Sequence, residues 1–82
     1  MRQPVLYSQF CDPHSILVIN VSGKLRRLFC PFRVKCVKQV MNIPKGSWVI
    51  VEEVAMTPKD ELIFIISGRP YAHAYFQIFI QF

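Results

Sequence analysis

The feature that most constrains the fold is the succession of short apolar runs and turn signals in the second half of the chain. Between residues 32 and 82, runs rich in aromatic and β-branched residues alternate with segments that contain glycine or proline. Such runs, bounded by turn residues, are typical of β-strands. No stretch of about ten residues repeats apolar side chains with the period of an amphipathic helix. The pattern therefore predicts an all-β protein.

The 82 residues are enough for one domain, so 1–82 is interpreted as a single domain. Its predicted strands are residues 16–21, 25–29, 32–36, 48–51, 62–66 and 71–80. The first two strands form an N-terminal hairpin over 16–29, because Ser22 and Gly23 between them are turn residues. Residues 1–15 are predicted to be a loosely ordered arm or a first, poorly aligned strand.

The spacing of the turns favours a small antiparallel barrel or a strongly bent sheet of five to six strands, with residues 32–82 as its core. Alternation of side chains along each strand assigns the buried positions. The predicted core comprises Val34, Cys36, Trp48, Ile50, Val51, Val54, Leu62, Phe64, Ile66, Phe76 and Ile78. The run 48–51 is apolar on both faces and is predicted to be the most buried strand, so a surface position for Trp48 stays open as an alternative.

The charged residues are unevenly distributed. Ten Lys and Arg against five Asp and Glu give a net charge of +5, and six of the basic residues fall between 24 and 38 with no acid among them. This stretch is interpreted either as a solvated surface or as a patch for phosphates or an acidic protein partner. The longest apolar run, 62–66, is far too short to span a membrane, so we expect no membrane association and a cytoplasmic location.

The last predicted strand carries the sharpest functional signal. If Ala72, Ala74 and Phe76 face the core, then Tyr71, His73 and Tyr75 line the opposite face. Aromatic rings at alternate positions suit the stacking of single-stranded bases. The basic residues predicted to hold the phosphates are Arg33, Lys35 and Arg69. The alternatives are tyrosines packed under a loop or in a dimer contact, or a peptide groove.

The cysteines and histidines suggest no catalytic or metal site. Cys11, His14, Cys30 and Cys36 are four candidate zinc ligands, but the spacing of the last two is longer than is usual and Cys36 shares the predicted core face. The cysteines are therefore interpreted as small buried apolar residues. No glycine-rich phosphate loop or nucleophile elbow is present. We expect no metal, no cofactor and no enzymatic activity.

The end of the chain is a candidate for strand pairing. Residues 76–82 have high β-propensity and contain no charge, proline or glycine. As an edge strand such a segment recruits another chain. It is predicted to be covered either by residues 16–21 or by a partner, which makes homo-oligomerisation through the C-terminal strand the alternative to nucleic-acid binding.

The order of strands and turns also resembles a known family. The segments 34–36, 44–51, 62–64 and 68–71 resemble the strand and turn succession of Src-homology-type small barrels over residues 32–82. Nucleic-acid-binding relatives, the Kyrpides–Ouzounis–Woese and Tudor-like domains, share this succession. The layout is also similar to that of short, uncharacterised bacterial proteins. The resemblance implies a small β-barrel binding module.

Overall fold

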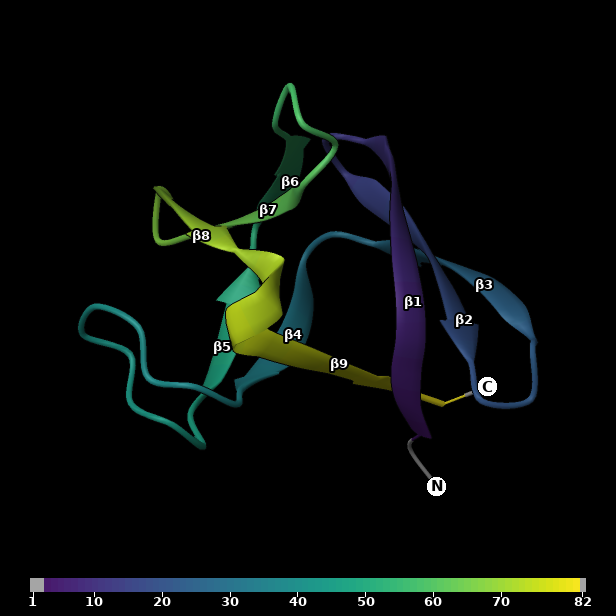
Figure 1. The fold of residues 1–82 in the computed structure, drawn as a ribbon, viewed down its shortest axis with the longest axis horizontal. Coiled ribbons are helices and arrows are strands. Elements are labelled where there is room, and N and C mark those ends of the chain that lie inside the picture. The colour runs from purple at the N-terminus through teal and green to yellow at the C-terminus, as the bar shows by residue number, and fades with distance from the viewer. Residues whose placement is uncertain (1–2, 82) are drawn as a thin grey trace.

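Strand pairing in the computed structural model, which describes residues 3–81, organises the chain into two antiparallel sheets (Figure 1). The prediction of an all-β protein is confirmed. The elements in the described residues are β1 (Gln3–Asp12), β2 (Ser15–Asn20), β3 (Leu25–Phe29), β4 (Phe32–Cys36), β5 (Trp48–Val51), β6 (Glu53–Met56), β7 (Leu62–Ile66), β8 (Arg69–Ala72), the 3₁₀ helix η1 (His73–Tyr75) and β9 (Phe76–Ile80).

The larger sheet has six strands in the order β3-β2-β1-β9-β4-β5, and the smaller has three in the order β6-β7-β8. The chain passes from one sheet to the other between β5 and β6. Here the amide of Glu52 donates a hydrogen bond of 2.9 Å to the carbonyl of Ile65 on β7. The strand pairs of residues 3–81 do not close into a barrel.

The N-terminal hairpin is formed by β2 and β3, as the turn residues predicted. Asn20 organises this turn from a buried position that sequence reasoning missed. Its side-chain oxygen accepts hydrogen bonds from the amides of Ser22 and Lys24, and its side-chain nitrogen donates to Gln3. Because both polar atoms of the buried amide have hydrogen-bond partners, its burial costs little stability.

Most of the segment predicted as an arm or a poorly aligned strand is the strand β1. It pairs with β2 along its length and joins β9 through the pairs Gln3↔Ile80 and Pro4↔Phe79. The register with β2 shifts between Val5 and Tyr7. A bulge of this kind interrupts the alternation of side chains, which explains why the sequence pattern there is irregular.

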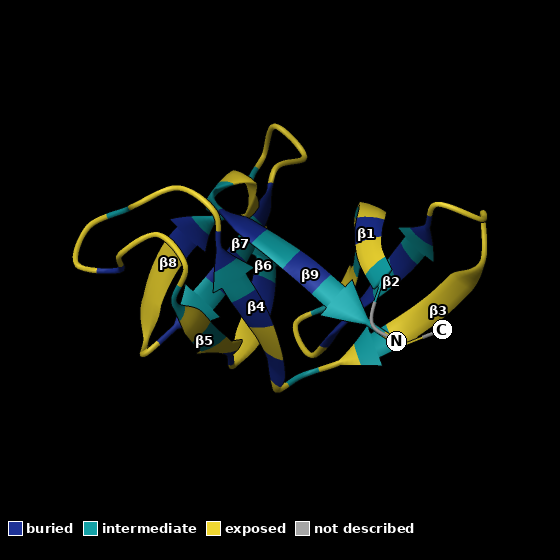
Figure 2. Ribbon diagram, turned by 90° about the horizontal axis from the view of Figure 1, so that it is seen from below, coloured by how far each residue is buried: buried dark blue, intermediate teal, exposed yellow. Residues whose placement is uncertain are grey.

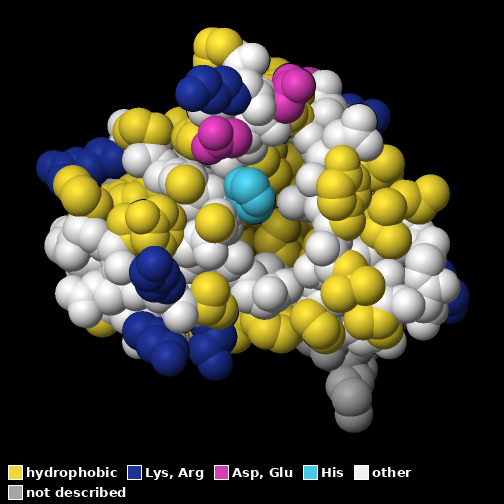
Figure 3. Space-filling view, in the orientation of Figure 1, with side chains coloured by type: hydrophobic (Ala, Val, Ile, Leu, Met, Phe, Trp, Pro, Cys, Tyr) yellow, Lys and Arg dark blue, Asp and Glu magenta, His cyan; other side chains and the backbone are white. Residues whose placement is uncertain are grey.

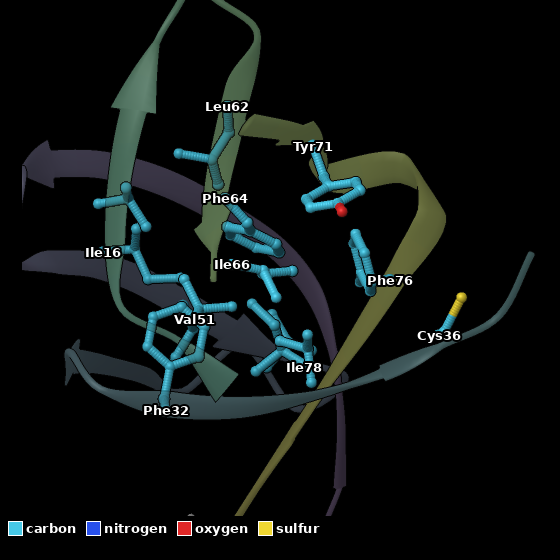
Figure 4. Packing of buried hydrophobic residues seen from close by; sticks show 14 of the residues in the cluster. Ile16, Phe32, Cys36, Val51, Leu62, Phe64, Ile66, Tyr71, Phe76 and Ile78 are labelled. Carbon is cyan, nitrogen blue, oxygen red and sulfur yellow. The ribbon is translucent and has the colours of Figure 1, made fainter. Parts of the chain in front are cut away.

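The core lies between the inner face of the larger sheet and the smaller sheet (Figure 4). Phe64 is at its centre, with ring centroids 5.7 Å from Phe32 and 6.1 Å from Phe76. These aromatic contacts stabilise the core beyond the burial of apolar area. The correctly predicted core residues are Val34, Cys36, Val51, Val54, Leu62, Phe64, Ile66, Phe76 and Ile78.

The core prediction is wrong for Ile50, and for Trp48 the alternative of a surface position is confirmed, because β5 is half-exposed rather than the most buried strand. Trp48 is 45% exposed and Ile50 is 53% exposed. The register Phe32↔Val51 turns Val51 inward beside Phe32. Side chains alternate along a strand, so Trp48 and Ile50 lie on the face of the larger sheet that points away from the core. Figure 2 shows exposed positions along β5.

The predicted final strand over 71–80 is also wrong, because η1 divides it into β8 and β9. Tyr71 and Phe76 are five residues apart, so an unbroken strand would put them on opposite faces. The 3₁₀ turn allows both rings to enter the core, where their centroids are 6.1 Å apart (Figure 4). Burial of both rings outweighs the strand propensity of residues 73–75.

The C-terminal strand β9 is not an edge, and residues 16–21 do not cover it. It pairs with β4 from Cys36↔Phe76 to Val34↔Ile78 and with β1 at its other end. The outermost strands of the larger sheet are instead β3 and β5. Within residues 3–81, no helix is long and apolar enough to cross a membrane.

Candidate nucleic-acid interface

The outer face of β9, β4 and β5 gathers basic and aromatic side chains. Residues directly opposite in an antiparallel pair project to the same face of the sheet. Arg33 lies opposite Ile50, and Lys35 lies opposite Trp48 on one side and Gln77 on the other. Phe79 shares this face with Gln77, two residues away on β9. We call Arg33, Lys35, Trp48, Ile50, Gln77 and Phe79 the outer face.

Two aromatic rings meet across β4 on the outer face. The ring centroids of Trp48 and Phe79 are 6.0 Å apart, with an angle of 58° between the ring planes. The guanidinium carbon of Arg33 is 5.6 Å from the centroid of the Trp48 ring. A cation at this distance is attracted to the electron-rich face of the indole. Arg33 and Phe79 also line a hollow of about 250 Å³ with Phe32, Ile80 and Gln81.

The charge of the outer face is wholly positive in the described residues. No Asp or Glu stands at an outward position of β4, β5 or β9. The nearest acid along the chain, Glu52, accepts a hydrogen bond from the amide of Gly68 at the corner between the sheets. The acid in the hairpin, Asp12, is paired with Arg27 at 2.6 Å. Arg33 and Lys35 therefore keep their charge available for an anion.

Only two of the six predicted site residues lie on the outer face. Arg33 and Lys35 lie on the outer face, but Arg69 on β8 lines a separate hollow with Val49 and Tyr71. The expectation that Tyr71, His73 and Tyr75 form one exposed row is wrong. Tyr71 is only 7% exposed and belongs to the core, because η1 breaks the alternation on which the prediction depended.

The other two rings of the predicted row have separate surroundings. His73 is exposed, and its Nδ1 lies 3.0 Å from the carbonyl oxygen of Leu62, so Nδ1 carries the proton and donates. Tyr75 is half-buried, with the ammonium of Lys38 at 5.9 Å from its ring centroid. Neither ring is part of the outer face.

Sequence reasoning missed the aromatic half of the outer face. Trp48 stands on a strand that is apolar on both faces, so alternation alone does not orient it, whereas alternation from Gln77 turns Phe79 outward. The sequence does show which face points outward on β4, where Phe32, Val34 and Cys36 alternate with Arg33 and Lys35. Pairing β4 with its neighbours transfers that orientation to β5 and β9.

The cysteines and histidines do not form a reactive centre in the described residues. Cys36 is buried, and the backbone amide of Cys30 donates to the carbonyl of His14 at 2.7 Å. Partial burial, together with the negative charges of Asp12 and Glu53, raises the pKa of the Cys30 thiol. A raised pKa keeps the thiol protonated, which weakens it as a nucleophile and as a metal ligand. No group of three or more His, Cys, Asp or Glu side chains within residues 3–81 is placed to hold a metal ion.

Comparison with known proteins gives no relative for this chain. No protein-family model matches it, and neither a curated protein nor a solved structure is significantly similar to it.

Proposed function

We propose that the protein is a non-enzymatic binding module that holds single-stranded nucleic acid on its outer face. The observation that carries the proposal is the arrangement of Trp48, Phe79 and Arg33 on one face, where Trp48 and Arg33 are exposed and Phe79 is half-buried. Exposed aromatic rings offer stacking surfaces for bases of any sequence, and adjacent cations attract the phosphate backbone. Lys35, opposite Trp48, supplies the second charge.

Single-stranded nucleic acid suits this surface better than a duplex. The rings lie on a sheet face, without a projecting helix or ribbon of the kind that enters a major groove. Unpaired bases expose their flat faces to aromatic side chains, whereas bases in a duplex are already stacked on one another.

A test compares the affinity of matched variants for a fluorescent oligothymidylate of about ten nucleotides, a length in the range of small single-strand binding sites. Trp48→Ala should weaken binding by about 1–3 kcal/mol, or about five-fold to more than a hundred-fold. Phe29→Ala is the control, because Phe29 is also an exposed aromatic residue but lies on β3. Equal effects of the two substitutions would overturn the proposal.

Salt dependence tests the charged half of the site. Binding of the wild-type protein should weaken steeply between about 50 and about 200 mM salt. The double variant Arg33→Gln, Lys35→Gln should lower the slope of log affinity against log salt by about 1.4, because each lost phosphate contact removes about 0.7. The double variant Lys24→Gln, Lys59→Gln controls for the two lost charges, since these lysines lie in the β2–β3 and β6–β7 turns.

The second candidate function is a protein-interaction module. The exposed Ile50 beside Trp48 favours it, because apolar surface next to an aromatic residue is typical of protein contacts. In that case the partner is a protein or a second copy of the chain, and binding through apolar contacts should scarcely change with salt. Because β9 lies between β1 and β4, self-association of this kind is proposed through the apolar side chains of the outer face rather than through the edge of the C-terminal strand.

The fold is proposed to be of the Src-homology type, with a strongly bent sheet over residues 32–82. Six strands, β4 to β9, follow one another in this segment, and the chain turns from one sheet into the other at Glu52. A cytoplasmic location is part of the same proposal and is tested by fractionation of the producing cell.

A further inference from the structure

A groove separates β1 from η1 and the smaller sheet, and it borders the proposed nucleic-acid interface at Gln77. Its two parts have volumes of about 240 and 480 Å³ and share Tyr7, Ser8 and His73 as lining residues. Figure 3 shows the hollow near the centre of this face, beside a histidine and below acidic side chains. Because the two parts share lining residues, they form one continuous groove.

The groove begins where β1 separates from β9. The strands are paired at Gln3 and Pro4, and the side chain of Gln77 then bridges them. Its Nε2 donates to the carbonyl of Val5 at 3.0 Å and to that of Ile78 at 3.3 Å. Beyond Val5, the only strand that pairs with β1 in the described residues is β2, so the other edge of β1 faces the groove.

The hydrogen bonds of Asn20 identify the backbone groups that face the groove. Both backbone groups of Asn20 bond toward the β2–β3 turn, to Lys24 and Gly23. Backbone groups alternate between the two edges of a strand, so Ile19 and Leu17 of β2 bond to β1. Their opposite residues are Tyr7 and Gln9. The amides and carbonyls of Ser8 and Phe10 therefore point into the groove, where no strand of residues 3–81 pairs with them.

The opposite side of the groove carries a second strand edge. The amide of Val54 on β6 donates to the carbonyl of Pro13 at 2.9 Å, away from its neighbour β7. Met56, two residues along β6, directs its backbone to the same side. The side chain of Met56 lines the larger part of the groove together with Phe10 and His73. Two strand edges thus converge at Pro13 and flank the groove.

We propose that this groove binds an extended segment of a partner protein, which adds as a strand to the edge of β1. Strand addition supplies main-chain hydrogen bonds to Ser8 and Phe10, and such bonds provide affinity for extended peptides. His73 lines both parts of the groove, and because its Nδ1 is engaged by the carbonyl of Leu62, Nε2 is the ring nitrogen left for a polar contact with the bound segment.

The position of the groove selects the kind of occupant. Cα atoms of β1 and β6 approach within 8 Å of one another, which is too close for a strand paired to both, since neighbouring strands lie about 4.8 Å apart. The smaller sheet is therefore a wall of the groove opposite the edge of β1. A lone extended segment fits along β1 there, whereas the sheet edge of a second copy would bring its next strand against that wall. Asp60 lines the groove and Glu61 follows it, so a basic residue is favoured at that end and phosphates are repelled.

The test uses the capped peptide Lys-Val-Thr-Val-Thr-Val and the same peptide with alternate amides methylated. In amide NMR spectra the unmodified peptide should shift the signals of Ser8, Phe10 and Met56, with a dissociation constant of about 1 mM or tighter. The peptide whose methylated amides face β1 should not bind, because strand addition depends on main-chain donors. The proposal would be overturned if both peptides bound equally well, or if the unmodified peptide at about 1 mM shifted none of these signals.

Ser8→Pro provides the matching change in the protein. The Ser8 amide faces the groove and is not used by β2, so proline is tolerated there as on other open strand edges. The variant should retain the fold and lose at least ten-fold in peptide affinity. Gln9→Pro, which removes a bond to β2, should instead destabilise the protein. If Ser8→Pro dissociates a homodimer of the free protein, or if peptide shifts map to Trp48, the proposed occupant is wrong.

Discussion

Arg33 and Trp48 stand on neighbouring strands, and the guanidinium carbon of Arg33 lies 5.6 Å from the centroid of the indole ring. The contact joins the basic and the aromatic side chains into one surface, with Phe79 completing it on the far side of β4. An exposed cation–π contact contributes only about 0.5–1 kcal/mol to stability. The main consequence of the contact is therefore that a positive charge and an aromatic ring lie side by side on the surface. Such a pair suits a ligand that stacks on the ring and carries negative charge.

Tyr71 should prove to be a structural residue rather than a ligand contact. Tyr71→Ala removes a buried ring that packs against Phe76, and should lower the free energy of unfolding by about 3–5 kcal/mol. Tyr71→Phe keeps the ring and should leave oligonucleotide affinity unchanged. Urea unfolding and fluorescence anisotropy measure the two effects, and a loss of affinity in Tyr71→Phe would restore Tyr71 to the binding surface.

Gln77 should stabilise the junction between β1 and β9. Gln77→Leu leaves the carbonyl of Val5 without its side-chain donor, and should lower the free energy of unfolding by about 1 kcal/mol. Hydrogen exchange of the amides near Val5 should accelerate in the same variant. Gln39→Leu, in the exposed loop after β4, serves as the control. Equal stability of the two variants would contradict the bridging role.

Asp12 should make stability depend on acid pH. Its carboxylate accepts a hydrogen bond from the amide of His14 at 2.8 Å and pairs with Arg27, and these contacts lower its pKa below 3.8. The contribution of the Asp12 carboxylate to the stability of the folded state is therefore present above about pH 4. It is lost as the pH falls through the lowered pKa.

Asp12→Asn isolates the charge, because an amide oxygen still accepts from His14. The difference in melting temperature between the wild-type protein and the variant should be largest near neutral pH and should vanish in strong acid. A difference in melting temperature that grows as the pH falls would contradict the lowered pKa of Asp12.

The three cysteines should react with iodoacetamide in the order Cys11, Cys30, Cys36. Cys11 is exposed, Cys30 has a raised pKa, and Cys36 is buried with its Sγ 3.1 Å from the carbonyl of Lys38. Thiolates are the reacting species, so both burial and a raised pKa slow the reaction. Peptide mass spectrometry at successive times gives the three rates. Labelling of Cys36 as fast as Cys11 would contradict its place in the core.

The pattern of neighbouring residues was sufficient to predict the structure where one face of a strand is clearly polar. Arg33 and Lys35 orient β4, and Ser22 and Gly23 place the first hairpin turn. Gly46 adopts a φ of 93° in the turn after Pro44, a backbone conformation that glycine enters without steric cost. These features depend on neighbouring residues alone, so a single sequence carries them.

The rest of the site depends on contacts between distant residues. Trp48 is oriented by the pairing of β5 with β4, and the break at η1 depends on the joint burial of Tyr71 and Phe76. The groove depends on where Gln77 ends the junction of β1 and β9. The alternation of side chains within one strand reveals none of these contacts. For this reason the predicted aromatic row was placed on the wrong residues.

The central claim is tested most directly by the fluorescence of Trp48, the only tryptophan in the chain. Oligothymidylate added at about 50 mM salt should quench the emission in a saturable way, and raising the salt to about 200 mM should reverse the quenching. Emission that stays constant while anisotropy reports a bound oligonucleotide would place the ligand elsewhere. Absence of any binding at low salt would contradict the proposed function itself.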